Sequence, residues 1–215
     1  MTSIPMHIIE PLVDRSPGLQ DRPRLRQQAE EKDYLFLPAL LPYRKSYQVQ
    51  QEVLQVAQQH GLLREDTNPA EAIVRPGVYV DVEYTRNPTP DIRRFYNTIL
   101  SLRRFNALFR HPLVLQVVES LLAQPIFVHL RVICHLIFPG RPNHTADPHQ
   151  DFAPVRGSQH TRTAWIPLGH CGDHLGGVAM ALESHYHGLL DRHLLAQRPT
   201  ARSANGLELE PLQLW

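Results

Sequence analysis

Cysteine is scarce in this chain, and long apolar runs are missing. The 215 residues include only two cysteines, Cys134 and Cys171, which are too few for a disulfide framework and favour a reducing, cytoplasmic location. No stretch of about 18 apolar residues is present, so we expect no segment that spans a membrane. Residues 1–15 lack both a basic start and a cleavable apolar core, so we expect no signal peptide.

An excess of charge of one sign is also absent. The chain has 22 basic and 21 acidic side chains, for a formal net charge of +1. Such a balance creates no overall field that would draw the protein to nucleic acid or to an anionic membrane. Basic and aromatic residues do not cluster in one stretch either, so a nucleic-acid partner is not expected.

The first half of the sequence predicts mainly helices. Residues 1–33 are rich in Pro, Arg and Glu and are expected to form a mobile or loosely docked arm, followed by one domain over 34–215. A short strand is expected over 33–38 and another over 77–84. Apolar residues at helical spacing predict helices over roughly 43–60, with Gly61 as a cap, over 90–102, with Thr89 as a cap, and from Pro112 to about Leu121.

The second half of the sequence has a different residue pattern. Short β-rich runs, separated by loops that contain Gly, Pro and His, follow residue 125; they are IFVHL, RVICHLIF, TAWIPL and GVAMAL. Helices followed by strands suggest an α+β domain in which helices brace a β-sandwich or jelly roll.

The chemistry is concentrated around His149-Gln150-Asp151. In an extended segment residues two apart point to the same face, so His149 and Asp151 could reach one ion together. Two histidines and one carboxylate form the facial triad that holds Fe(II) in many oxygenases and leaves three positions open for a cosubstrate and O2. A histidine and an aspartate at this spacing are common by chance, so the motif needs its context.

That context resembles a known family. PHQDF is followed by TAWIPLG and then by LGGVAMALESHYHG. This order and spacing resemble the phytanoyl-CoA dioxygenase family of Fe(II)/2-oxoglutarate oxygenases. DYLFLPALLP and RFNALFRHPLVLQVVESLLAQPIFVHLRV resemble earlier parts of the same family, so that the resemblance covers roughly residues 33–190.

The resemblance implies a fold and several site residues. The fold would be a double-stranded β-helix, a cupin-like jelly roll, braced by the N-terminal helices. His149 and Asp151 would be iron ligands, and Trp165 would lie near the 2-oxoglutarate cosubstrate or simply in the core. Related halogenases have a small residue at the position of Asp151, so a carboxylate there favours hydroxylation over halogenation.

The family's second metal histidine, and the arginine that pairs with 2-oxoglutarate, lie later than any motif matched here. The last strands of the jelly roll would be missing as well, and the third ligand would lie outside this chain. His185 and His187 are substitute candidates, although the family uses the position of His185 structurally. Candidates for the cosubstrate carboxylate, each of which could instead be a solvated surface charge, are Arg131, Arg141, Arg156 and Arg162.

Three functions follow as hypotheses. The first is a dioxygenase that uses Fe(II), 2-oxoglutarate and O2 to hydroxylate a C–H bond of a small organic substrate, whose identity the sequence leaves open. The second is a truncated or inactive jelly-roll binding module without the full metal triad. The third is a zinc site, since His and Asp also suit zinc, although an open jelly-roll mouth favours iron.

Overall fold

The computed structural model describes most of the first two thirds of the chain and shorter pieces of the rest. The described residues are 10–78, 90–137, 150–152, 158, 160–171, 177–181, 184–189 and 213–214. Within them the elements, in chain order, are η2 (Ser16–Gly18), α1 (Arg22–Lys32), α2 (Tyr43–Gln59), η3 (Pro69–Glu71), α4 (Pro90–Ser101), α5 (Arg103–Phe109), α6 (Pro112–Leu122), β1 (Leu136–Ile137), η6 (Ser184–His187) and β2 (Gln213–Leu214).

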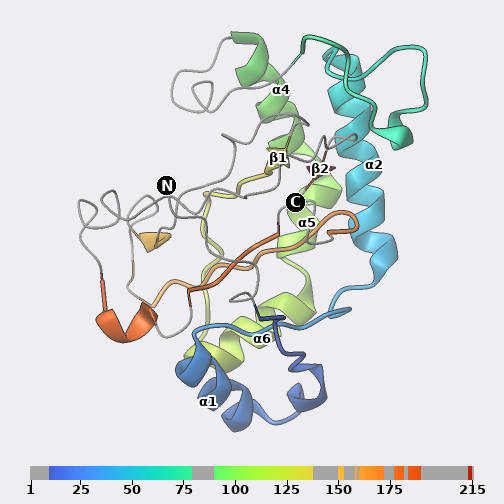
Figure 1. Ribbon diagram of the computed structural model, residues 1–215. Helices are drawn as coiled ribbons and strands as arrows, with labels where there is room; N and C mark the ends of the chain where they lie inside the picture. Colours follow the sequence, from blue (N-terminus) through green and yellow to red (C-terminus); the bar gives the residue numbers. More distant parts are fainter. Residues whose placement is uncertain are drawn as a thin grey trace, which may run out of the picture.

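Helices α2 and α4 run side by side and carry most of the core (Figure 1). The apolar spacing predicted both helices, and their observed bounds confirm the prediction. Val49 and Val53 of α2 are fully buried, as is Ile99 of α4. Gly61 follows α2 with a φ of +70°, a conformation that glycine adopts at little cost and that ends a helix. Thr89, the expected cap of α4, lies outside the described residues.

Helix α5 was not predicted as a separate element. A single residue, Leu102, separates it from α4, because Leu102 has an extended conformation with a ψ of 125°. The side chain of Asn106 donates hydrogen bonds to the carbonyl oxygens of Leu100 and Leu102, at 2.6 and 3.0 Å. The bend is therefore fixed by an amide that satisfies the carbonyls at the end of α4.

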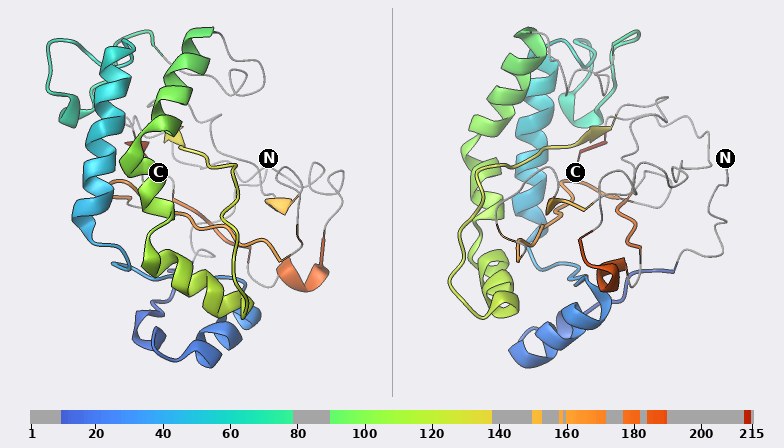
Figure 2. Two further views of the ribbon diagram at one scale, coloured as in Figure 1. Left: turned by 180° about the vertical axis from the view of Figure 1, so that it is seen from behind. Right: turned by 90° about the vertical axis from the view of Figure 1, so that its left-hand side faces the viewer.

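Part of the expected N-terminal arm is a docked helix. Asp21 caps α1 by accepting a hydrogen bond from the backbone N–H of Arg24 at 3.0 Å, and Leu25 is 1% exposed. The guanidinium of Arg26 donates to the carbonyl oxygen of Ser120 on α6, with its two nitrogens at 3.0 and 3.3 Å. Figure 2 shows α1 against α6 at the end of the molecule away from the start of α4. Residues 22–32, in the region expected to be a mobile or loosely docked arm, form a helix that contacts α6.

The described strands are short. β1 pairs antiparallel with β2, with Leu136 opposite Leu214 and Ile137 opposite Gln213. Of the strand expected over 33–38, the structure shows a single bridge between Phe36 and Asp14. The described parts of 126–130, 163–168 and 177–182 have no assigned strand. Of 77–84, only the first two residues are described. The double-stranded β-helix thus stays a prediction.

A tyrosine connects the helices to the first β-rich run. The phenol of Tyr96 on α4 accepts a hydrogen bond from the backbone N–H of Cys134 at 2.9 Å and lies 3.3 Å from the Cys134 carbonyl oxygen, to which it donates. Burial raises the pKa of Tyr96 to about 12, so its proton stays available for donation at any physiological pH.

Replacing Tyr96 with phenylalanine is expected to lower the free energy of unfolding by about 1–3 kcal/mol, because two buried backbone groups of Cys134 lose their partner. Urea unfolding measures the change, with Tyr43→Phe as the matched control because Tyr43 is 70% exposed. Equal stabilities of the two variants would show that the Tyr96 contact contributes nothing.

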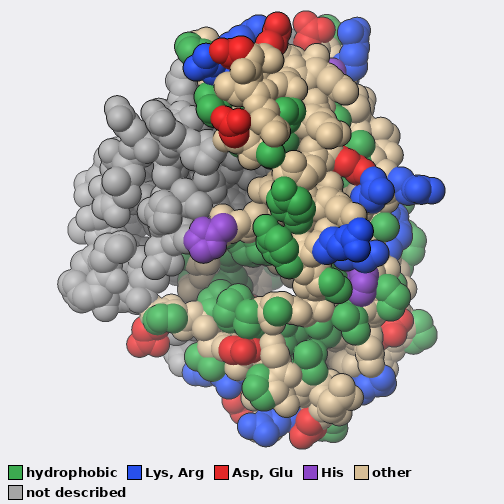
Figure 3. Space-filling view, turned by 90° about the vertical axis from the view of Figure 1, so that its right-hand side faces the viewer, with side chains coloured by type: hydrophobic (Ala, Val, Ile, Leu, Met, Phe, Trp, Pro, Cys, Tyr) green, Lys and Arg blue, Asp and Glu red, His purple; other side chains and the backbone are tan. Residues whose placement is uncertain are grey.

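The surface carries both charged and apolar regions. On the face shown in Figure 3, exposed hydrophobic side chains lie across the middle, and charged side chains lie at the top, at the bottom and at the right-hand edge of the middle. Tyr43 and Tyr47, in the first turns of α2, are both exposed and stack with ring centroids 5.7 Å apart. No helix in the described part of the chain is long and apolar enough to cross a membrane.

Candidate functional site

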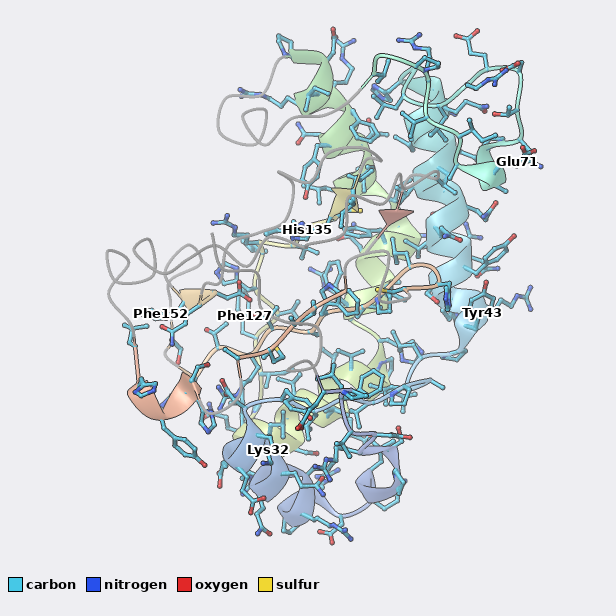
Figure 4. All side chains as sticks on the ribbon, in the orientation of Figure 1. Lys32, Tyr43, Glu71, Phe127, His135 and Phe152 are labelled. Carbon is cyan, nitrogen blue, oxygen red and sulfur yellow. The ribbon has the colours of Figure 1, made fainter. Side chains whose placement is uncertain are left out.

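The described part of the central motif begins at Gln150, and His149 lies just outside it. The backbone turns at Asp151 and is helical at Phe152, which differs from the extended run that the sequence suggested. Strand geometry therefore does not apply at Asp151, and a shared face for residues 149 and 151 stays a prediction. Figure 4 labels Phe152 beside η6, on the opposite side of the molecule from Tyr43 at the start of α2.

Two hydrogen bonds connect this motif to the two motifs that follow it. The hydroxyl of Thr163, in the TAWIPL run, donates to Oδ2 of Asp151 at 2.5 Å. The side-chain amide of Gln150 donates to the carbonyl oxygen of Gly188 at 2.9 Å. The three segments are up to 38 residues apart in sequence, and the fold brings them together at Gln150 and Asp151. The structure thus places the three quoted motifs in contact.

His185 connects η6 to the end of α1. Its Nε2–H donates to the carbonyl oxygen of Glu30 at 2.9 Å, and the phenol of Tyr186 donates to the carbonyl of Glu31 at 3.4 Å. Both carbonyls belong to the last turn of α1, where helix carbonyls lack an intrahelical partner. Nδ1 of His185 is buried and has no hydrogen-bond partner among the described residues. Because Nε2 is engaged by a backbone carbonyl, His185 acts in this structure as a docking residue, while His187 is exposed.

The candidates for the cosubstrate have different surroundings. Trp165 is 40% exposed, so it is not a fully buried core residue. Arg131 and Arg162 are exposed, and the backbone N–H of Arg131 donates to Nδ1 of His129 at 3.0 Å. Arg141 and Arg156 lie outside the described residues. The roles of Trp165 and Arg131 toward the cosubstrate stay predictions.

The thiol of Cys134 is not a candidate for chemistry at this site. Cys134 is 2% exposed, and burial raises the pKa of its thiol to about 12. A thiol with such a pKa stays protonated at neutral pH and is a poor nucleophile and a poor metal ligand. Cys134 and Cys171 are not joined in a disulfide.

The donor types of the predicted pair His149 and Asp151 are those that suit a divalent iron, and the iron site stays a prediction. Imidazole and carboxylate together form the preferred set for non-haem Fe(II), and Asp151 is held by a neighbouring hydroxyl in the way that metal-ligating carboxylates usually are. Within the described ranges no group of three or more His, Cys, Asp or Glu side chains is arranged to hold a metal ion. The case for iron at this site therefore depends on the donor types of the predicted ligands and on the environment of Asp151.

Comparison with known proteins gives a partial similarity to hydroxylases. The chain is 34% identical over 89 residues to a 1-deoxypentalenic acid 11-beta-hydroxylase of Streptomyces exfoliatus, and 35% identical over 91 residues to the protein of that name from Streptomyces arenae. Each match covers 40% of this chain and 31% of the relative, so the chain spans about a third of the length of these hydroxylases. No family model matches the chain. No solved structure matches it either.

Sequence reasoning missed two of the residues that organise the site. In the sequence, Thr163 is simply the first residue of TAWIPL, and Gln150 is the residue between His149 and Asp151. Neither residue type signals a role by itself, because threonine and glutamine are common on surfaces. Their contacts depend on a turn at Asp151 and on the approach of η6, and both are tertiary features.

Proposed function

We propose that this chain is part of an Fe(II)- and 2-oxoglutarate-dependent dioxygenase that hydroxylates a C–H bond of a small organic substrate. The observation that carries the proposal is the similarity to two enzymes named as hydroxylases. Support comes from the order of the three motifs and from the contacts that bring them together at Asp151.

Different residues of the chain would have different roles in this reaction. His149 and Asp151 would hold the iron, with a further ligand still to be assigned. When bound, Fe(II) with 2-oxoglutarate and O2 supplies the oxidising chemistry of the reaction. The protein's own task is to orient the ligands and the substrate's C–H bond and to keep water away from the reacting atoms. The carboxylate at position 151 favours hydroxylation, and the reaction would take place in the predicted jelly-roll mouth, in the cytoplasm.

Removing the metal tests this function. The protein expressed from its complete reading frame is expected to form succinate from 2-oxoglutarate when supplied with Fe(II), ascorbate and O2. Excess chelator should reduce succinate formation to background, and added Fe(II) should restore it. Coupled detection of succinate and of hydroxylated product by mass spectrometry provides the measurement, with 1-deoxypentalenic acid as the first substrate because it is named for both relatives.

Two results would redirect the assignment. Tight binding of Zn(II), together with no succinate formation when Fe(II) is supplied, would favour the zinc site. Absence of succinate together with absence of Fe(II) binding would favour the inactive binding module. Succinate without product from the first substrate would keep the dioxygenase chemistry and reject only that substrate.

A further inference from the structure

The side chain of Asp151 is held by a residue outside its own motif. Thr163 donates its hydroxyl proton to Oδ2 of Asp151 over 2.5 Å, which is a typical length for a hydrogen bond from a hydroxyl to a carboxylate. A carboxylate offers about four lone-pair positions on two oxygens, so a hydrogen bond to Oδ2 is compatible with metal binding by the same group. The contact is solvent-exposed and should therefore contribute little to folding stability. Its main consequence is geometric.

The position of Thr163 is set by the core. Leu168, in the same run, is 2% exposed and belongs to the hydrophobic cluster built on α2, and Ile166 packs against that cluster. At the other end, Thr161 makes two hydrogen bonds to the carbonyl oxygen of Ser158, from its backbone N–H at 3.1 Å and its hydroxyl at 2.7 Å. The run is therefore anchored to the core at its Leu168 end and closed by a local turn at Thr161, and it presents the Thr163 hydroxyl between them.

The backbone next to Asp151 has its own anchor. The amide of Gln150 bonds the carbonyl of Gly188, which directly follows η6, and η6 is docked on α1 through His185. The side chains of Gln150 and Asp151 are thus bonded by different segments of the chain. Such outer contacts orient metal ligands before the metal arrives and typically change metal affinity by about 10- to 100-fold when they are removed.

We propose that Thr163 is a positioning residue that fixes the side-chain rotamer of Asp151 for metal binding. The inference rests on the proposed function, because it assigns Asp151 as an iron ligand. Thr163 would act only through Asp151 and would touch neither the metal nor the substrate. The side-chain amide of Gln150 separately links the motif to Gly188, which follows η6.

Metal affinity of two variants tests the role of the hydroxyl. Thr163→Val removes the hydroxyl at nearly constant shape and is expected to weaken Fe(II) binding about 10- to 100-fold in anaerobic titration calorimetry, whereas Thr163→Ser should bind nearly as tightly as the wild type. Thr98→Val is the matched control, because the Thr98 hydroxyl bonds only the carbonyl of Arg94 within α4. In an Asp151→Ala background, Thr163→Val should have no further effect, since coupled residues are not additive.

A second measurement separates this inference from the proposed function. In the metal-free protein, NMR coupling constants of Asp151 should report one χ1 rotamer in the wild type and averaging in Thr163→Val. Unchanged Fe(II) affinity in Thr163→Val would overturn the inference, as would averaging in the wild type. A wild-type protein that binds no Fe(II) would overturn the proposed function, and a single rotamer lost in Thr163→Val would still support the positioning contact.

Discussion

Replacing Asp151 with alanine is expected to abolish succinate formation and to lower the affinity for Fe(II) by well over 100-fold. Loss of an outer-shell contact alone typically costs 10–100-fold, so loss of a direct ligand should cost more. Asp151 is one of the two proposed iron ligands, and a site with His149 alone would hold Fe(II) weakly. Anaerobic titration calorimetry and mass-spectrometric detection of succinate provide the two measurements.

The control for Asp151 is another exposed carboxylate. Asp66→Ala removes the partner of Arg64, whose guanidinium lies 2.5 Å from the Asp66 carboxylate, and should leave both metal affinity and turnover unchanged. His149→Ala should reproduce the loss seen for Asp151→Ala. If Asp151→Ala keeps wild-type affinity while His149→Ala loses it, the assigned carboxylate is wrong and the metal site must be built from other oxygen donors.

The helices could be predicted because their signals are local. In α2 and α4 the apolar residues repeat at helical spacing, and Gly61 and Pro90 mark the ends, so each boundary is encoded within a few residues. The signals for α1 were also present, since Asp21 and Pro23 are a cap and a first-turn proline. The polar composition of residues 1–33 nevertheless favours an arm, because α1 is held by Leu25 and by the bond from Arg26 to α6, which no local pattern reveals.

The strands and the site are harder to predict from the sequence because they depend on segments that are distant along the chain. A β-rich run becomes a strand only when another segment pairs with it, as Leu136 does with Leu214. The sequence identified the motif around Asp151 from residue types and order, and the structure brings all three motifs together there. It could not identify Thr163 as the partner of Asp151, because that contact needs the turn at residue 151 as well as the anchored run that carries Thr163.

The anchoring of that run leads to the largest expected effect on stability. Leu168 is 2% exposed and packs in the cluster that includes Val53 of α2 and Ile99 of α4. A Cβ added to the neighbouring Gly169 would clash with the Gln50 side chain, so this backbone also lies directly against α2. Leu168 therefore joins the run that carries Thr163 to the helical layer.

Leu168→Ala is expected to lower the free energy of unfolding by about 2–5 kcal/mol, because it removes a buried side chain and leaves a cavity that the surrounding helices fill only in part. Leu130→Ala is the matched control: Leu130 is 82% exposed, and its loss should change stability by less than about 0.5 kcal/mol. Urea unfolding followed by circular dichroism measures both.

Similar small changes in the two variants would mean that the run is not part of the core, and the fixed position of the Thr163 hydroxyl would then lose its physical basis. A large loss for Leu168→Ala alone would instead show that the same packing that stabilises the fold also holds the partner of Asp151 in place.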